Sequence, residues 1–371
     1  MKNVMGIIDL KENEAELRAI TRHRTLAAVP FAGRYRIIDF ILSSMVNSGI
    51  ENIGVLAQNK YRSIMDHLKS GKEWDLARKR EGLFILPSRG NGSEELYRDD
   101  VGRLFSNLDY IVRSQQKYIL ITGSNGICNI DYRKVFKYHQ HVQADITMLY
   151  KEGQEGFGTA TKQTVFTCDE HNRITQIVSK SNHAAGEKVS MNMYIMEKNL
   201  LIDIINECCV AGDLDLVTEC IAKKASKLKI YGYRHNGYFA QINSLLSYYH
   251  HNMALLKPEN WKQLFVDSGL IYTKTKDEGP AKYKETAMVS NSIVASGCII
   301  EGRVENSILF RGVKVYEGAY IKDSIIMERC AVNRNAYLEK VICDKNALIT
   351  AGKRLRGSLE NPTVIEKGAL V

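Results

Sequence analysis

Long apolar runs are missing from this sequence. No window approaches the roughly 18 consecutive apolar residues that a membrane-spanning helix requires. The first residues, Met-Lys-Asn-Val-Met-Gly-Ile-Ile-Asp, lack the apolar stretch of a signal peptide. We therefore expect a cytoplasmic protein with no membrane partner.

Metal-binding cysteine motifs are also missing. The eight cysteines form no Cys-x-x-Cys motif, and no histidine lies at zinc-ligand spacing from a pair of them. In a reducing compartment, such cysteines are most simply small buried hydrophobic residues.

Clustered positive charge is the third missing feature. Lys and Arg number 51 against 42 Asp and Glu, which gives a net charge of +9. The excess is spread along the chain, and no basic run is interleaved with aromatic residues. Nucleic-acid binding normally uses a focused basic patch. We therefore expect no nucleic-acid partner and a mildly basic surface that tolerates anionic metabolites.

Alternating strand and helix patterns fill roughly the first 250 residues. Short apolar runs predict buried strands, and apolar spacings of three and four predict helices between them. This alternation favours a mainly parallel α/β sheet, in which ligands bind beyond the carboxyl ends of the strands, here after Ile8 and Ile121. The predicted strands are Val4–Ile8, Ile53–Ala57, Tyr118–Thr122 and Ala144–Tyr150, and the predicted helices are Asp39–Ser48 and Tyr61–Leu68.

A repeat of six residues dominates the C-terminal part of the chain. Val315, Ile321 and Met327 stand six apart, and Ala319, Ile325 and Ala331 follow them by four. An apolar residue stacked on every turn is typical of a parallel β-helix. A polar, charged stretch broken by Gly-Pro precedes the repeat. We therefore expect an α/β domain over 1–255, a linker over 256–284 and a β-helix over 285–371.

One passage is specific enough to indicate a family. Val-Pro-Phe-Ala-Gly-Arg-Tyr-Arg-Ile-Ile-Asp-Phe, from Val29 to Phe40, closely resembles the start of the bacterial ADP-glucose pyrophosphorylases, also called glucose-1-phosphate adenylyltransferases. Further matches are Trp74-Asp-Leu, Ser190-Met-Asn-Met-Tyr-Ile and Gly237-Tyr. The resemblance covers essentially the whole chain. It implies a Rossmann-like nucleotide-sugar transferase (GT-A-like) domain followed by a left-handed parallel β-helix, usually assembled as a tetramer.

The reaction that the resemblance implies joins ATP to glucose 1-phosphate and releases pyrophosphate. It needs a glycine-rich loop at the triphosphate, a basic side chain on that loop and carboxylates for Mg²⁺. The family's Gly-Gly-x-Gly-x-Arg-Leu is matched here by residues 11–17, which contain no glycine and place Glu16 where the arginine should be. Glu12, Glu14 and Glu16 would repel a triphosphate.

The metal positions that the resemblance implies are changed as well. The aspartate of the family's Ser-Gly-Asp-His is matched by Asn125, and the aspartate of Gly-Tyr-Trp-x-Asp-Val-Gly by Gln241. The family's Gly-Thr-Ala-Asp-Ala stretch in the nucleotide pocket reads Asp99-Asp-Val-Gly-Arg103. We therefore expect no catalytic residues, no metal site at these positions and no cofactor, because binding of Mg²⁺ and ATP should be lost.

Several sugar-phosphate positions of the family survive. Lys180 matches the lysine of Glu-Lys-Pro, Ser190 and Tyr194 match Ser-Met-Gly-Ile-Tyr, and Tyr97 matches a tyrosine near the sugar. The resemblance implies a vestigial sugar-phosphate site. Retention for packing and surface solubility explains the same residues equally well.

His23, Arg24 and Arg36 match basic positions that the family uses for anionic allosteric effectors. An ion-paired or solvated surface is the alternative.

The resemblance favours a non-catalytic, regulatory subunit of the GlgD type, which would pair with a catalytic subunit in bacterial glycogen synthesis and would also self-associate. The alternative is an active glucose-1-phosphate adenylyltransferase with a rearranged site. A β-helix acyltransferase would need a histidine base in the repeat. No histidine follows His251, which excludes that function.

Overall fold

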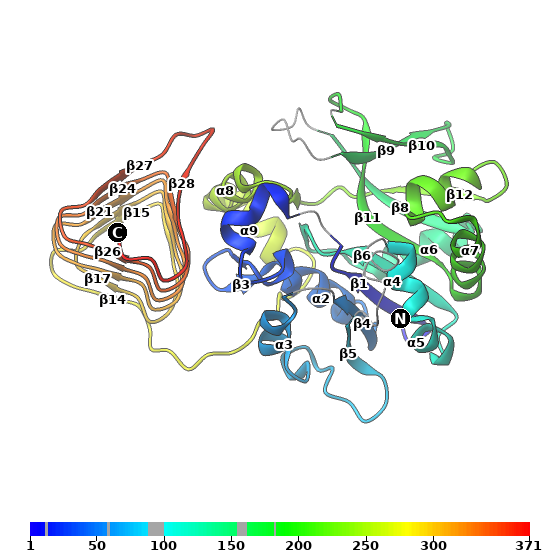
Figure 1. Ribbon diagram of the computed structural model, residues 1–371, viewed down its shortest axis with the longest axis horizontal. Helices are drawn as coiled ribbons and strands as arrows, with labels where there is room; N and C mark the ends of the chain where they lie inside the picture. Colours follow the sequence, from blue (N-terminus) through cyan, green and yellow to red (C-terminus); the bar gives the residue numbers. More distant parts are fainter. Residues whose placement is uncertain (12–13, 58–59, 88–99, 154–161, 182) are drawn as a thin grey trace. The chain divides into compact units, whose positions relative to one another are not determined.

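The computed structural model describes residues 1–11, 14–57, 60–87, 100–153, 162–181 and 183–371. These residues divide into two compact units, each built from segments that are distant in the sequence (Figure 1). Unit 1 comprises Met1–Asn13, Phe40–Gln241 and Ser268–Tyr272. Unit 2 comprises Glu14–Asp39, Ile242–Asp267 and Thr273–Val371.

A twisted mixed sheet forms the centre of unit 1. Its main path runs β10-β9-β11-β6-β1-β4-β5, and β8 pairs with both β11 and β12. The strands β5, β4, β1 and β6 are parallel, as the alternation of strands and helices predicts, whereas β11 runs antiparallel to β6. The strands are β1 (Val4–Asp9), β4 (Asn52–Ala57), β5 (Gly82–Pro87), β6 (Tyr118–Gly123), β8 (Ile146–Glu152), β9 (Gln163–Cys168), β10 (Ile174–Lys180), β11 (Lys188–Glu197) and β12 (Ile230–Arg234). A separate short ladder joins β7 (Gly126–Cys128) to β13 (Phe239–Gln241).

Helices cover this sheet because its side chains alternate between two apolar faces. On one face, Ile7 and Tyr194 join a buried cluster with Leu104 of α4 and Leu201 of α7. On the other face lies Gly6, where a Cβ atom would stand 2.8 Å from Met45 of α2. The helices whose residues lie in unit 1 are most of α2 (Ile37–Asn47), α3 (Arg62–Leu68), α4 (Asp100–Ser106), α5 (Leu108–Arg113), α6 (Tyr132–His141), α7 (Lys198–Ala211) and the π-helical turn η4 (Leu216–Ile221).

Unit 2 contains a parallel β-helix, as the six-residue repeat predicts. Three five-stranded parallel sheets form its faces, and Figure 1 shows the coils stacked on one another. Stacked residues such as Val315 and Val332 are paired in register and buried inside it. The three sheets have the orders β14-β17-β20-β23-β26, β15-β18-β21-β24-β27 and β16-β19-β22-β25-β28. The strands are β14 (Lys282–Tyr283), β15 (Met288–Ser290), β16 (Ile293–Val294), β17 (Ile299–Ile300), β18 (Arg303–Glu305), β19 (Ile308–Leu309), β20 (Lys314–Val315), β21 (Tyr320–Lys322), β22 (Ile325–Ile326), β23 (Ala331–Val332), β24 (Tyr337–Glu339), β25 (Val341–Cys343), β26 (Leu348–Ile349), β27 (Arg354–Arg356) and β28 (Thr363–Ile365).

Two further segments belong to unit 2. The N-terminal one contains α1 (Arg18–Thr21), β2 (Pro30–Phe31) and β3 (Tyr35–Arg36), and the other contains α8 (Leu245–Met253) and α9 (Pro258–Phe265). Helix α8 begins with a capping box between Ser244 and Ser247. Tyr248 of α8 donates a hydrogen bond to the Pro30 carbonyl at 2.7 Å, which joins the two segments. The range expected as a linker, 256–284, therefore includes the helix α9.

The cysteines differ from expectation in two ways: Cys168 and Cys209 are only half-buried, and another two form a disulfide. Cys208 and Cys220 are joined by a disulfide, so the expectation that all eight are simply small buried hydrophobic residues is wrong for this pair. Their separation of 12 residues matches no motif, and only the packing of α7 against η4 brings the two sulfurs together.

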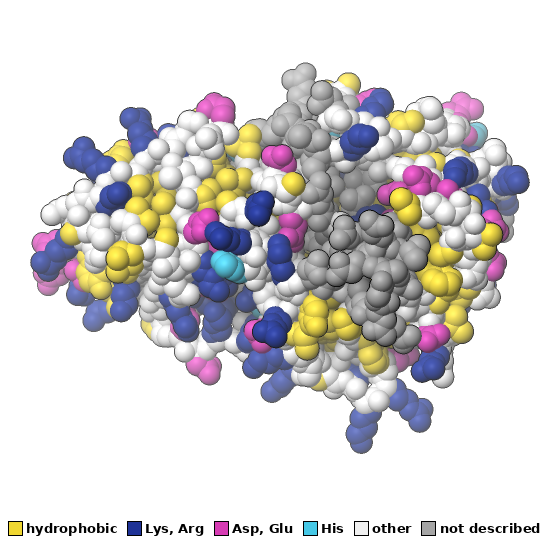
Figure 2. Space-filling model, in the orientation of Figure 1, with side chains coloured by type: hydrophobic (Ala, Val, Ile, Leu, Met, Phe, Trp, Pro, Cys, Tyr) yellow, Lys and Arg dark blue, Asp and Glu magenta, His cyan; other side chains and the backbone are white. Residues whose placement is uncertain are grey.

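The surface agrees with the charge pattern of the sequence. Lys and Arg side chains are spread over the face shown in Figure 2, with Asp and Glu side chains between them. Among the described residues, no helix combines the length and the apolar character that a membrane crossing requires.

The close stacking of the β-helix coils predicts that two Gly→Ala substitutions differ in their effect on the free energy of unfolding. A Cβ atom at Gly302 would lie 2.3 Å from the Ala319 carbonyl oxygen, whereas one at Gly279 would meet nothing within 4 Å. Gly302→Ala should lower the free energy of unfolding by about 1–3 kcal/mol, because the backbone must shift. Gly279→Ala, the matched control, should change it by less than about 0.5 kcal/mol. Urea denaturation followed by circular dichroism measures both, and equal midpoints would contradict the stacking argument.

Candidate functional site

The carboxyl ends of β1 and β6 lie side by side in unit 1. Asp9, the last residue of β1, pairs in register with Gly123, the last residue of β6. Ligands of parallel α/β sheets bind beyond this edge. The position expected from the sequence for a ligand is therefore formed, and the side chains around it decide what it can hold.

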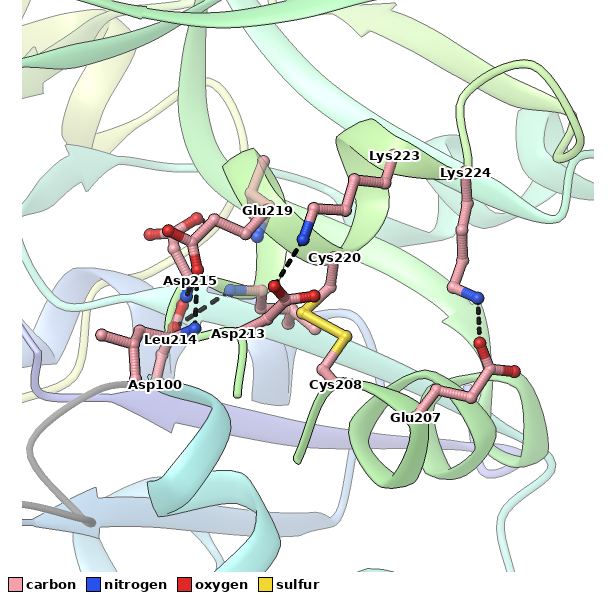
Figure 3. Close-up of a disulfide and its surroundings, with 12 residues drawn as sticks. Asp100, Glu207, Cys208, Asp213, Leu214, Asp215, Glu219, Cys220, Lys223 and Lys224 are labelled. Carbon is pink, nitrogen blue, oxygen red and sulfur yellow. Dashed lines mark hydrogen bonds and ion pairs between the residues drawn. A yellow bond between two sulfur atoms is a disulfide. The ribbon is translucent and has the colours of Figure 1, made fainter. Parts of the chain in front are cut away.

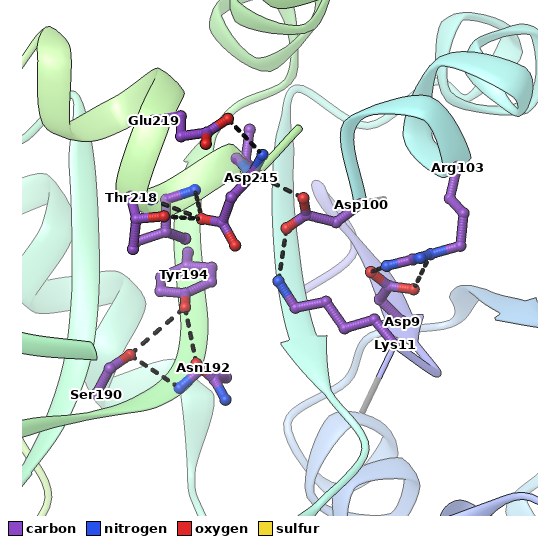
Figure 4. Close-up of polar contacts among 12 residues, drawn as sticks. Asp9, Lys11, Asp100, Arg103, Ser190, Asn192, Tyr194, Asp215, Thr218 and Glu219 are labelled. Carbon is purple, nitrogen blue, oxygen red and sulfur yellow. Dashed lines mark hydrogen bonds and ion pairs between the residues drawn. The ribbon is translucent and has the colours of Figure 1, made fainter. Parts of the chain in front are cut away.

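Arg103 of α4 occupies this edge through a bidentate ion pair with Asp9. Its Nε donates to Asp9 Oδ1 at 2.9 Å and its Nη2 donates to Oδ2 at 2.9 Å (Figure 4). The two side chains are only 3% and 5% exposed. Paired donors and acceptors in this parallel arrangement make the strongest type of charged hydrogen bond. Both charges are thus neutralised inside the unit and are not available to a ligand.

A second ion pair lies next to the first. Lys11 Nζ donates to Asp100 Oδ2 at 2.5 Å, and the other Asp100 oxygen accepts the backbone N–H of Leu216 at 3.0 Å. Burial disfavours the charged form of Lys11, but Asp100 and, more weakly, Tyr194, Asp9 and Asp215 outweigh it and raise the pKa of Lys11 above its ordinary value. Lys11 is therefore held as a cation by the protein's own carboxylates.

The remaining polar groups at this edge also have partners within the chain. Asp215 caps the turn η4 by accepting the backbone N–H groups of Val217 and Thr218, at 3.0 and 2.6 Å. Burial opposes its charge, yet Lys11 and these hydrogen bonds lower the pKa of Asp215. Tyr194 donates to Asn192 at 3.2 Å, and burial raises the pKa of Tyr194 to about 12.

Very little space is left between these groups. The cavity that the described residues enclose here has a volume of about 10 Å³ and is lined by Asp9, Lys11, Asp100, Leu104, Ile121, Thr122, Gly123, Asn192, Tyr194 and Leu216. A cavity of this size holds about one water molecule. The described side chains thus fill the edge of the sheet where ligands of this fold class bind.

The two positions matched to metal ligands carry neutral amides. Gln241 on β13 pairs in register with Gly126 on β7, so it lies beside Asn125, which is buried. The Gln241 amide oxygen accepts a hydrogen bond from Gln163 at 3.0 Å. Mg²⁺ prefers anionic oxygen ligands. Asn125 and Gln241 supply no negative charge, and one of their oxygens is already used, so these residues do not fit the ion.

The expected sugar-phosphate residues are only partly brought together. Ser190 and Tyr194 are buried on β11, with their hydroxyl oxygens 3.4 Å apart. Lys180, at the end of β10, forms an ion pair with Glu187 at 2.6 Å. Tyr97 lies outside the described residues. Sugar-phosphate binding by these four residues stays a prediction.

The expected effector residues lie in unit 2 and differ from one another in burial. Arg24 is buried, forms an ion pair with Asp344 of the β-helix and donates to the Ile20 carbonyl at 2.9 Å. His23 is exposed, and Arg36 is half-buried at the end of β3.

Lys345 is a neighbouring basic group that the sequence reasoning missed. It forms an ion pair with Glu328. Burial lowers the pKa of Lys345 to about 8, opposed by Glu328 and assisted by the positive charges of Arg36 and Arg24. No local motif marks Lys345, because Arg24 and Arg36 lie about 300 residues away in the sequence.

Residues 11–17, which match the family's glycine-rich triphosphate loop, include two glutamates that the structure describes. Glu14 accepts the backbone N–H of Leu26 at 2.7 Å, within unit 2, and Glu16 is exposed. Glu12 lies outside the described residues. The sequence predicted where β1 and β6 end, but not the ion pairs that fill this edge. Ligand binding at the edge stays a prediction.

Comparison with known proteins decides the family. The sequence model described as nucleotidyl transferase matches residues 15–256, and the one described as a GlmU-like C-terminal hexapeptide region matches residues 279–360. The chain belongs to the nucleotidyl transferase family. Its two-part architecture, an α/β domain with a mainly parallel centre followed by a left-handed β-helix of hexapeptide repeats, is that expected from the sequence.

Similar proteins span nearly the same length. The glycogen biosynthesis protein GlgD of Bacillus subtilis is 40% identical over 368 residues, which cover 98% of this chain and 96% of the relative. GlgD of Geobacillus stearothermophilus is 39% identical over 99% of this chain and 97% of the relative. Glucose-1-phosphate adenylyltransferase of Fervidobacterium nodosum is 31% identical over 96% of this chain and 86% of the relative. The resemblance to this family, and to its GlgD members, is confirmed.

The ion pair at the end of β1 predicts a large effect of one arginine on stability. Arg103→Ala should lower the free energy of unfolding by about 3–5 kcal/mol, because it leaves the Asp9 carboxylate buried without a partner. Arg133→Ala, the matched control, removes an arginine whose side chain is 59% exposed and should cost less than about 1 kcal/mol.

Urea denaturation measures the effect of both substitutions. Replacing both partners, as Asp9→Leu with Arg103→Leu, should recover much of the loss, because no charge then remains buried. An Arg103→Ala protein as stable as the Arg133→Ala control would contradict the assignment of a buried, mutually dependent pair.

Proposed function

We propose that the chain is a cytoplasmic, non-catalytic regulatory subunit of glucose-1-phosphate adenylyltransferase (ADP-glucose pyrophosphorylase), which modulates a catalytic subunit in bacterial glycogen biosynthesis. Full-length similarity to two proteins named for glycogen biosynthesis supports the pathway. Similarity over nearly the whole chain to glucose-1-phosphate adenylyltransferases supports the link to that reaction.

One observation carries the non-catalytic part of the proposal: the filling of the sheet edge by Arg103–Asp9 and Lys11–Asp100. A nucleotide at this edge would have to displace both ion pairs. Leaving a buried charge without its partner costs about 3–5 kcal/mol, and a micromolar ligand binds with only about 8 kcal/mol in total. The free-energy cost of breaking both ion pairs is therefore similar in size to the whole binding free energy of a micromolar nucleotide ligand.

The metal positions support the same proposal. Asn125 and Gln241 are neutral, so a Mg²⁺–triphosphate complex would meet no carboxylate at either of them. Lys11 offers a positive charge, but Asp100 already holds it. We therefore propose that binding of both ATP and Mg²⁺ has been lost, and that the chain requires no cofactor.

An anionic effector is the proposed ligand of the basic group in unit 2. Within the group of His23, Arg24, Arg36 and Lys345, Arg24 pairs with Asp344 and Lys345 pairs with Glu328. Burial is the main cause of the lowered pKa of Lys345, and the positive charges of Arg36 and Arg24 lower it further. An added anion would favour the charged form of Lys345 and raise its pKa, so effector binding should weaken as the pH rises above about 8, where Lys345 of the free protein loses its proton.

Regulation would then act through assembly. A chain that keeps the fold of a catalytic family can bias the conformational equilibrium of a partner subunit if it contacts the partner's two states differently. The flank of the β-helix is the proposed contact surface, both with the catalytic subunit and with further copies of this chain. Arg34–Leu56 is not suited to this role, because Arg34 is its one exposed residue.

Mixing experiments test the proposal. The isolated chain should form no ADP-glucose from ATP, glucose 1-phosphate and Mg²⁺, and light scattering should detect an oligomer. With a catalytic subunit from the same cell it should form a hetero-oligomer whose apparent affinity for substrate or effector changes roughly 5- to 150-fold, which corresponds to a coupling of about 1–3 kcal/mol.

The catalytic subunit alone is the control for the kinetics. Turnover by the isolated chain of about 1–1000 per second would overturn the non-catalytic proposal. A monomer that leaves the partner's kinetics unchanged would overturn the regulatory one.

A further inference from the structure

Two cysteines and an aspartate form a compact cluster in unit 1. Cys208 lies in the last turn of α7, Cys220 lies in the turn η4, and Asp213 lies in the short connection between them (Figure 3). One ligand atom of each residue lies within 4.8 Å of the others. Among the described residues, this is the one such group of His, Cys, Asp or Glu that could surround a metal ion.

The surroundings of the cluster suit a metal centre. Cys208 and Cys220 are 2% and 1% exposed, which keeps both sulfurs away from bulk water. Asp213 Oδ1 accepts a 2.5 Å contact from Lys223 Nζ, whose side chain is 62% exposed. A carboxylate has two oxygens, so one can bind a metal while the other stays paired with Lys223. Such outer partners orient metal ligands in proteins.

We propose that Cys208, Cys220 and Asp213 form a redox-gated binding site for a thiophilic divalent cation of the zinc class. Two thiolates and one carboxylate carry three negative charges, which the dication and the Lys223 ammonium balance. Thiolate sulfur with one carboxylate is a ligand set that zinc accepts, with water as a fourth ligand. The proposal is independent of the proposed function.

The disulfide is the oxidised, metal-free state of the same site. A dithiol reductant opens it by attack of a thiolate on one sulfur, and its second thiol then resolves the mixed disulfide. The two cysteines gain two electrons and two protons, and the reductant becomes a disulfide. Metal binding then releases the two thiol protons, since the thiolate is the ligand.

The disulfide and the metal-bound site would each hold the connection between α7 and η4 in place. Both cross-link α7 to η4 and so fix residues 212–215, which connect them, and the start of η4. In this connection the Leu214 carbonyl accepts the N–H of Val101, and the Leu216 N–H donates to Asp100. The cross-link therefore holds the segment against the start of α4, beside the Lys11–Asp100 pair.

Cobalt titration of the full-length protein tests the site. After reduction with a dithiol and removal of the reductant without air, Co²⁺ should bind at one ion per chain. The spectrum should show near-ultraviolet thiolate-to-cobalt charge-transfer bands and the intense visible bands of tetrahedral cobalt, and Zn²⁺ should abolish both. Hydrogen peroxide, which takes two electrons and two protons from the thiols to give water, should restore the disulfide and prevent binding.

Substitutions identify the ligands. Cys208→Ser should remove the stoichiometric charge-transfer signal, and Asp213→Asn should weaken Zn²⁺ binding by about tenfold or more. Cys209→Ser is the matched control, since it changes the neighbouring cysteine and should leave the spectrum unchanged.

Cobalt binding can also be compared between the reduced and the oxidised forms of the unsubstituted protein, a test that does not depend on whether a variant folds. A reduced chain that gives no cobalt bands, or bands that persist in Cys208→Ser, would overturn the proposal. The pair would then be a disulfide without a metal-bound state.

Discussion

Both oxygens of Asp9 meet the guanidinium of Arg103 where β1 ends, and the arrangement of this whole edge follows from that contact. Two charges that are almost fully buried must stay paired, because separating them costs several kcal/mol. The pairing holds α4 over the end of β1. Asp100, at the start of the same helix, then reaches Lys11 and the N–H of Leu216, which ties the next segment to the edge.

The same contact explains how a nucleotidyl transferase fold can be kept while its ligand edge is closed. The strands β1 and β6 still end side by side, as ligand binding in this kind of sheet requires. Arginine and lysine side chains that could meet phosphate meet aspartates of the same chain instead. In unit 2, the buried Arg24 likewise pairs with an aspartate of the same chain, Asp344 of the β-helix.

Local patterns in the sequence predicted the elements whose neighbours are near in sequence or repeat regularly. The apolar runs of β1, β4 and β6 marked the parallel strands within a residue or so, and the six-residue period marked the β-helix. The antiparallel part of the sheet was not predicted, because β11 pairs with β6 and β8 through contacts that no local pattern records.

The side-chain contacts at the site could not be predicted from local patterns either. Asp9 and Arg103 stand 94 residues apart, and Cys208 meets Cys220 only after α7 and η4 have packed. Replacement of the expected carboxylates by Asn125 and Gln241 was visible in the sequence, since it needs only the identity of a residue at a matched position. Which groups would occupy the vacated space depends on long-range packing and had to be seen in the structure.

Calorimetric titration of Mg²⁺–ATP into the isolated chain tests the closed edge most directly. The account predicts no saturable heat at nucleotide concentrations up to ~1 mM, because a ligand would have to displace Arg103 from Asp9 and Lys11 from Asp100. Binding of one nucleotide per chain with a micromolar dissociation constant would contradict it.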